Sequence, residues 1–204
     1  MKPFKSQRGI VAPLDRSNVD TDQIIAKQFL KSIARTGFGP QLFYDWRYQA
    51  DGKPNPDFSL NQPRYQNASI LVAGNNFGCG SSREHAVWAI QQYGFEAVVA
   101  PSFADIFKNN CSKNAVVTIE LAEAKVREIF KLIDQNAGLE ATVDLEKQLF
   151  VLHAPKESSF HFDVDPSVKE RLLRGLDDIG TTLKYEEALR VFEARHDTQL
   201  SSHG

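Results

Sequence analysis

Residues 69–93 read SILVAGNNFGCGSSREHAVWAIQQY, which is an apolar run, a glycine-rich turn and a longer mixed stretch in direct succession. The run at 69–73 is typical of a buried strand, and the stretch 82–93 is typical of a helix that follows it. A strand, a helix and a further strand are predicted next, at residues 97–100, 103–111 and 116–119. This alternation predicts an α/β fold with parallel strands.

Further elements are predicted on both sides of this region. Residues 10–13 end a first strand, and a helix over 122–136 is expected to stop near Gly138. The remaining predicted strands are 141–145, 149–153 and 160–164, and the remaining helices are 167–174, opened by Pro166, and 185–195, before a frayed end at 198–204.

The segment 37–67 interrupts this regularity. It is rich in Gly, Pro, Asn and aromatic residues and has no clean period. Two interpretations stay open: a functional or mobile loop, or a surface hairpin whose aromatic side chains pack onto the body. We expect residues 1–165 to form one domain that carries this excursion, and residues 166–204 to form a helical extension of that domain.

Composition excludes several classes of protein. The chain has 204 residues, 42% of them hydrophobic, and 24 Lys and Arg against 26 Asp and Glu. Such a near-neutral balance with scattered basic residues gives no footprint for nucleic acid or an anionic membrane. The N-terminus lacks the apolar stretch of a signal peptide, so a cytoplasmic protein is expected. Two cysteines, Cys79 and Cys111, form no CxxC pair, and the histidines show no metal-ligand spacing, so we expect free thiols and no metal bound by this chain.

Candidate chemistry is concentrated in the turn 74–85. Glycines after a buried strand, followed by a helix, bring backbone N–H groups and the positive end of the helix dipole together as an anion site. A Walker A loop is excluded because no Lys precedes Ser81, and a dinucleotide fingerprint is excluded because Arg83 occupies the third glycine position. The planar guanidinium of Arg83 suits a carboxylate, which favours a small acid as substrate.

Simpler roles exist for the same residues. Ser81 and Glu84 have capping-box spacing, so one serine hydroxyl could cap the helix while the other faces solvent beside Arg83. Cys79 could be a nucleophile at a helix N-terminus, but no partner base is evident, and packing is the simpler interpretation. His85, inside the helix, is expected to be buried and hydrogen-bonded.

The segment 78–86, GCGSSREHA, resembles the GxGSSREHA signature of the swivelling domain of the aconitase superfamily. Two more blocks agree: NVDTDQII at 18–25 and PSFADIFKNN at 101–110. The resemblance spans about residues 5 to 195, and the block KQFL at 27–30 makes the chain most similar to the free-standing small subunits of bacterial 3-isopropylmalate dehydratases. The implied fold is the swivelling β/β/α domain with C-terminal helices.

That resemblance implies a hydro-lyase acting in leucine biosynthesis, active only as a heterodimer with a large subunit. The 4Fe-4S cluster of the family is expected on the large subunit, and this chain would bind no cofactor. Ser81 matches the family's catalytic base. The positions matched to substrate binding are Gly80, Ser82 and Arg83, and those matched to supporting roles are Thr21, Asp22 and His85.

Specificity is indicated by Phe29 and Leu30, which stand near the place where aconitases carry an arginine for the extra carboxylate of citrate. They could form an apolar pocket for an isopropyl group, or they could simply belong to the core. Two rival functions remain: the small subunit of a related hydro-lyase of the citramalate or homoaconitate type, and a nucleotide- or ligand-binding regulatory module that uses the same anion site.

Overall fold

One mixed sheet of seven strands organises the chain. The computed structural model describes residues 1–31 and 34–176. The strands are β1 (Ser6–Leu14), β2 (Ile70–Ala73), β3 (Ala97–Ala100), β4 (Val117–Glu120), β5 (Glu140–Asp144), β6 (Leu149–Leu152) and β7 (Ser158–His161). Their order in the sheet is β4-β3-β2-β1-β5-β6-β7.

The long strand β1 joins two halves of the sheet that differ in strand direction. Its second half pairs with β2 in parallel, with Val11 opposite Ile70. Its first half pairs with β5 in antiparallel fashion, with Gly9 opposite Ala141. The strands β2, β3 and β4 continue the parallel half, whereas β6 and β7 complete an antiparallel meander.

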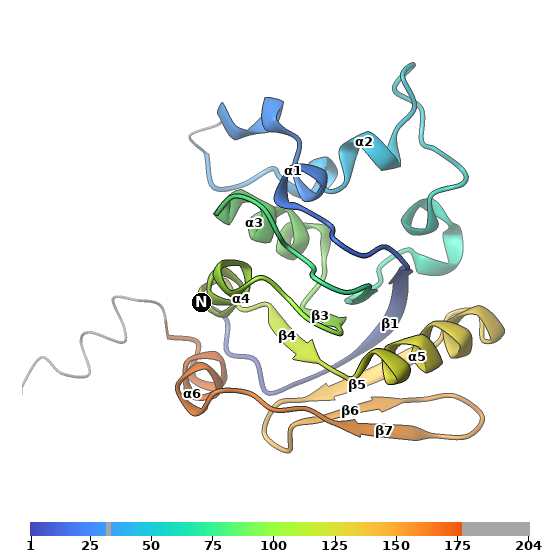
Figure 1. Cartoon of the computed structure of the whole chain (residues 1–204), viewed down its shortest axis with the longest axis vertical. Helices are drawn as coiled ribbons and strands as arrows, with labels where there is room; N and C mark the ends of the chain where they lie inside the picture. The colour runs from blue at the N-terminus through green and yellow to red at the C-terminus, as the bar shows by residue number, and fades with distance from the viewer. Residues whose placement is uncertain (32–33, 177–204) are drawn as a thin grey trace, which may run out of the picture.

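Helices cover both faces of the parallel half. The longer ones are α3 (Glu84–Tyr93), α4 (Asp105–Lys113), α5 (Glu123–Gln135) and α6 (Pro166–Arg174). Figure 1 shows the sheet between α3 and α4 on one side and α5 on the other, and α5 contacts β1, β2 and β3. All residues of β2 and β3 are buried, because strands covered on both faces tolerate only apolar side chains.

The predicted α/β alternation is confirmed, with small shifts in the bounds. The strand predicted at 116–119 is β4, which lies one residue later along the chain. The strand predicted at 160–164 is β7, which ends at His161. Asp165 accepts hydrogen bonds from the backbone of Ser167 and Val168 and caps α6, with Pro166 at its first position. The predicted helix 185–195 and the end 198–204 lie outside the described residues. None of the helices in the described part is long and apolar enough to cross a membrane.

The excursion 37–67 packs against the body of the protein. It contains four single-turn helices, η2 (Gly39–Gln41), α2 (Tyr44–Arg47), η3 (Ser59–Asn61) and η4 (Pro63–Tyr65). Four of its aromatic side chains are buried, namely Phe38, Phe43, Phe58 and Tyr65. The packed interpretation is therefore correct for these side chains, although one short hairpin bridge, between Tyr48 and Pro54, is present.

Candidate active site

The site is built where the chain leaves β1 and β2. The two loops that follow these parallel strands continue side by side, because each hydrogen-bonds to the other's backbone. Asn18 N–H donates to the Asn75 carbonyl at 2.8 Å, and Gly78 N–H donates to the Val19 carbonyl at 2.8 Å. Thr21 N–H then donates to the Cys79 carbonyl at 2.9 Å. The sequence blocks 18–25 and 78–86 therefore meet in space.

Two glycines are needed in this turn. Gly78 has φ +75°, and a Cβ there would lie 2.2 Å from the Phe107 ring of α4. Gly80 has φ +89°, a backbone region that L side chains rarely adopt. The turn can therefore pass close to α4 and reverse direction before α3 only with glycine at these positions.

A short capped helix, α1 (Thr21–Ile24), contacts the turn from the other side. Asp20 caps it by accepting from Gln23 N–H at 2.8 Å, and the Gln23 side chain accepts from Asp20 N–H at 2.9 Å. The buried Thr21 hydroxyl donates to the Ser81 carbonyl at 2.8 Å. Asp22, the next residue, forms an ion pair with Arg83.

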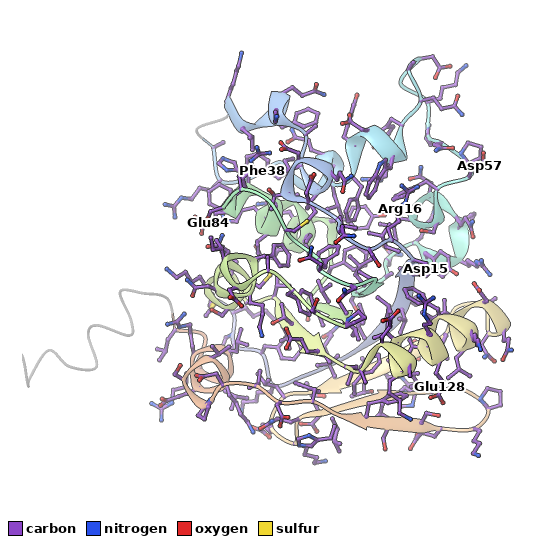
Figure 2. The ribbon with its side chains drawn as sticks, viewed as in Figure 1. Asp15, Arg16, Phe38, Asp57, Glu84 and Glu128 are labelled. Carbon is purple, nitrogen blue, oxygen red and sulfur yellow. The ribbon has the colours of Figure 1, made fainter. Side chains whose placement is uncertain are left out.

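Helix α3 starts at Glu84, two residues later than predicted, and this changes the role of both serines. Its N-cap is Arg83, which has extended backbone angles and makes no side-chain cap. The expectation that Ser81 or Ser82 caps the helix is wrong, because both stand outside the first turn and neither hydroxyl has a hydrogen-bond partner within the described chain. Glu84 instead accepts a hydrogen bond from the Asn114 side chain, and Figure 2 shows Glu84 at the beginning of α3.

Donors at this turn remain unused. The side chain of Arg83 is 14% exposed, and Asp22 is its only hydrogen-bond partner in residues 1–31 and 34–176, so most of its N–H groups are unpaired there. The backbone N–H groups of Gly80, Ser81 and Ser82 likewise have no acceptor in these parts of the chain. Ser81 and Ser82 are exposed. Unpaired N–H groups at the N-terminus of a helix favour an anion.

The open side of the turn is a shallow hollow of about 10 Å³. Its lining brings together residues from α1, the turn and α4: Thr21, Gly78, Gly80, Ser81, Ser82, Arg83, Ile106, Phe107 and Asn110. Ile106 is 55% exposed. No local sequence pattern pointed to Ile106 or Asn110, although both belong to the recognised block 101–110. A bridge between Phe77 and Phe103 brings that block to the turn.

Larger hollows occur elsewhere, but they lack these groups. One of about 260 Å³ is lined by residues 2–7 and part of the α3 end, and one of about 230 Å³ lies between α4 and the segment before α6. Neither contains a serine beside an arginine. The site is assigned by its chemical groups rather than by its size, because a volume near 10 Å³ holds only about one water molecule.

Cys79 does not have the properties of a nucleophile. Burial raises the pKa of its thiol above the ordinary value, and the negative charge of Asp20 adds to this effect. Burial also raises the pKa of Cys111 in α4. Both thiols are free, as expected. At neutral pH each stays protonated, which favours the packing interpretation for Cys79.

His85 differs in part from the expectation. Its ring is only half-buried, and it packs against Phe38 at 5.2 Å and Trp88 at 4.8 Å between ring centroids. Within the described residues it has no hydrogen-bond partner, so the expected buried hydrogen bond is absent there. Figure 2 shows Phe38 beside α3, which places His85 in an aromatic contact between that helix and the excursion.

Phe29 and Leu30 lie on η1 (Lys27–Lys31), directly after α1. Both are half-buried against the core, and the Phe29 ring contacts Tyr44 at 5.0 Å between centroids. They are absent from the lining of the hollow. The structure therefore brings Thr21, Asp22, Gly80, Ser81, Ser82 and Arg83 together, whereas Phe29 and Leu30 pack against the core on the next element of the chain.

The side chains of the described residues offer no metal centre. No group of three or more His, Cys, Asp or Glu side chains within residues 1–31 and 34–176 could hold a metal ion. The buried thiol of Cys111 and the glycine-flanked Cys79 are far too few donors for an iron-sulfur cluster. These residues do not fit such a cluster.

Comparisons with known proteins agree with this geometry. Residues 1–124 match the family described as the aconitase C-terminal domain. The chain is 56% identical to the 3-isopropylmalate dehydratase small subunit of Methylibium petroleiphilum, over 95% of this chain and 93% of the relative. It is 51% identical to the subunit of the same name from Desulforapulum autotrophicum, over 98% of each.

Among solved structures, the chain is similar to a 3-isopropylmalate dehydratase from Methanocaldococcus jannaschii. The TM-score is 0.63 and the identity 25%, over 92% of this chain and 99% of that one. The α/β fold with a sheet curled between helices is thus shared with that dehydratase chain. By sequence, fold and the turn at 78–86, the chain belongs to the 3-isopropylmalate dehydratase small-subunit family of the aconitase superfamily.

Proposed function

We propose that this chain forms one wall of a 3-isopropylmalate dehydratase active site and contributes to leucine biosynthesis in the cytoplasm. The reaction removes water from 2-isopropylmalate to give 2-isopropylmaleate and adds it back to give 3-isopropylmalate. The single observation that carries the proposal concerns residues 1–31 and 34–176: the exposed Ser81 and Ser82 have hydroxyls without a partner there, next to Arg83, whose donors are mostly unpaired there.

Ser81 is the proposed base that removes the carbon-bound proton. A neutral serine hydroxyl is a poor base, so the exposed Ser81 must first lose its own proton to solvent, and the resulting alkoxide must be stabilised. The unpaired N–H groups of Gly80 to Ser82, the N-terminus of α3 and the Arg83 charge supply that stabilisation. No step needs a Cys79 thiolate, whose formation is opposed by burial and Asp20.

Arg83 and Ser82 are the proposed contacts for a substrate carboxylate. A guanidinium can bind a carboxylate through two parallel hydrogen bonds, and among the described residues Arg83 is bonded only by Asp22, at Nη1. The ion pair with Asp22 keeps the side chain in place before the substrate arrives. Gly80 permits close approach because it carries no Cβ.

Phe29 and Leu30 are the proposed neighbours of the isopropyl group. The two side chains are half-buried on η1, directly after the helix that holds Thr21 and Asp22. An apolar pocket distinguishes substrates by about 1 to 3 kcal/mol for each methylene, so close analogues could also react.

The site is completed by a partner. A hollow of about 10 Å³ is far smaller than the roughly 300 Å³ or more of an ordinary ligand site, so a second wall is required. We propose that the wall is the large subunit of a heterodimer, and that this subunit holds the 4Fe-4S cluster, which activates the departing hydroxyl when bound. This chain's part is to bind the acid and to move a proton at the Ser81 oxygen.

The test is to purify this chain and a cluster-bearing large subunit separately without oxygen, then to follow the absorbance of the unsaturated acid. We expect no turnover by either chain alone and turnover by the mixture with 2- and 3-isopropylmalate. Citramalate and homocitrate are assayed in parallel, because faster turnover of either acid would assign the chain to a related hydro-lyase. Turnover by this chain alone, free of metal, would contradict the division of chemistry.

A further inference from the structure

The capped turn Asp20–Gln23 contacts both proposed functional residues from one rigid unit. Two reciprocal hydrogen bonds between Asp20 and Gln23 close the turn. From it the Thr21 hydroxyl reaches the Ser81 carbonyl, and the adjacent Asp22 carboxylate reaches the Arg83 guanidinium. One short element thus contacts the serine backbone and the arginine side chain separately.

The Thr21 contact is the stronger candidate for a dedicated role. The residue is 3% exposed, and it is one of three buried polar residues in the described parts of the chain. The 2.8 Å bond from its hydroxyl is the only hydrogen bond that Ser81 makes with another segment there. Ser81 follows Gly80, at φ +89°, and precedes the first turn of α3, so neither neighbour restrains it strongly.

We propose that Thr21 is the positioning residue for Ser81, an inference that rests on the proposed function. Thr21 binds the carbonyl of Ser81, which orients the peptide plane and with it the bond from Cα to Cβ. The Ser81 side-chain oxygen has no hydrogen-bond partner among the described residues, so that as the alkoxide it is free to take the carbon-bound proton. Because Thr21 is β-branched and buried, its own side chain has little rotational freedom.

The decisive variant is Thr21→Val, which keeps the branched shape and removes the donor. In the complex with the large subunit we expect kcat to fall about 10- to 100-fold, the loss typical of a group displaced by about 1 Å. KM should change little, because Asp22 still holds Arg83. Thr21→Ser, which keeps the hydroxyl, should restore most of kcat.

If Thr21 only stabilised the fold, the result would differ from that of a positioning role. Measuring the binding of a substrate analogue separates these two roles. Isopropylsuccinate, a dicarboxylate without the reacting hydroxyl, is titrated into each complex by calorimetry. Positioning predicts the wild-type number of binding sites and an unchanged Kd for Thr21→Val. Fewer sites in proportion to the lost kcat would overturn the proposal, since the loss would then reflect misfolded subunits.

The matched control is Thr142→Val in β5. Its hydroxyl makes a hydrogen bond of the same 2.8 Å length, to His153, in the antiparallel half of the sheet. This variant should keep wild-type kcat. If Thr21→Val does not assemble with the large subunit, Thr21→Ala is used, and failure of both to bind isopropylsuccinate would also refute the positioning role.

Failure of the inference is distinct from failure of the proposed function. An inactive Ser81→Ala complex combined with a fully active Thr21→Val complex would refute the role of Thr21 alone. An active Ser81→Ala complex would refute the proposed base and, with it, any positioning of that base.

Discussion

The chemistry of the proposed site depends on Ser81 and Ser82, whose hydroxyls make no hydrogen bond within the described residues. Ser81 and Ser82 stand before the first turn of α3, make no side-chain cap, and line the hollow on the open side of the turn. Arg83 is nearly buried yet keeps most of its donors unpaired in the described chain. Polar groups with no structural partner at a glycine-rich turn are available for a ligand.

At this scale we predict that Ser81→Ala abolishes turnover without unfolding the protein. Loss of a general base costs about 10² to 10⁴ in rate, whereas removal of an exposed hydroxyl without a partner should change the free energy of unfolding by under about 0.5 kcal/mol. Initial rates in the reconstituted complex and urea unfolding of the chain measure the two quantities. Ser159→Ala on β7 is the control and should keep full activity. A Ser81→Ala complex with most of its dehydration rate would remove Ser81 as the base.

The proposed site lies on short elements. The backbone pairing of β1 with β2 continues into the loops that follow these strands. The loops after β1 and β2 continue the parallel contact up to Thr21 and Cys79, so α1 stands beside the turn, and η1 follows α1 along the chain. The half-buried position of Phe29 and Leu30 on η1 fits a surface that a substrate or partner covers. Specificity is thus expected from a different element than the one that carries the base.

The prediction for η1 concerns Leu30→Arg. A charge beside the proposed isopropyl pocket should lower kcat/KM for isopropylmalate about 10- to 100-fold, and relative use of a tricarboxylate should rise. Gln28→Arg adds the same charge to an exposed position of the same helical turn and serves as the control. Steady-state kinetics on both acids give the ratio. Identical ratios for the wild type and Leu30→Arg would exclude η1 from the specificity site.

Across the whole molecule, the excursion 37–67 is held against α3, the helix that follows the turn 74–85. The Gln92 side chain of α3 accepts from Phe38 N–H at 2.9 Å, and Phe38 also packs on His85 and Trp88. A Cβ on Gly39 would lie 2.6 Å from the Gln92 carbonyl, so the two backbones are in close approach. The excursion therefore supports α3 and cannot be removed without exposing it.

We predict that Gly39→Ala lowers the free energy of unfolding by about 1 to 3 kcal/mol, the usual cost of overpacking where backbone must move. Urea unfolding measures it, and Thr36→Ala, an exposed neighbour, should leave the midpoint unchanged. An unchanged urea midpoint for Gly39→Ala would contradict the close packing of the excursion against the backbone of α3.

The sequence by itself predicted the order of the elements, because apolar runs and helical spacing are local properties of the chain. It also identified the turn 78–86 and the family, since glycines, two serines and an arginine in that order form a highly specific pattern. It could not decide whether residues 37–67 pack or stay uncovered, because aromatic residues without a period are compatible with both. It placed the start of α3 two residues too early, since helix propensity does not register the extended backbone of Arg83.

Only the tertiary structure decided how the site is held. Thr21 bonds to Ser81 across 60 positions of the sequence, Asp22 pairs with Arg83 across 61, and Ile106 joins the same hollow from α4. No local sequence pattern predicts such contacts, because they depend on where the paired parallel strands β1 and β2 end and their loops begin. The sequence determined which chemical groups are present and on which elements. The fold determined how the loops after β1 and β2 pair, which fixes Thr21 beside Ser81 while both serine hydroxyls have no bond to other described residues.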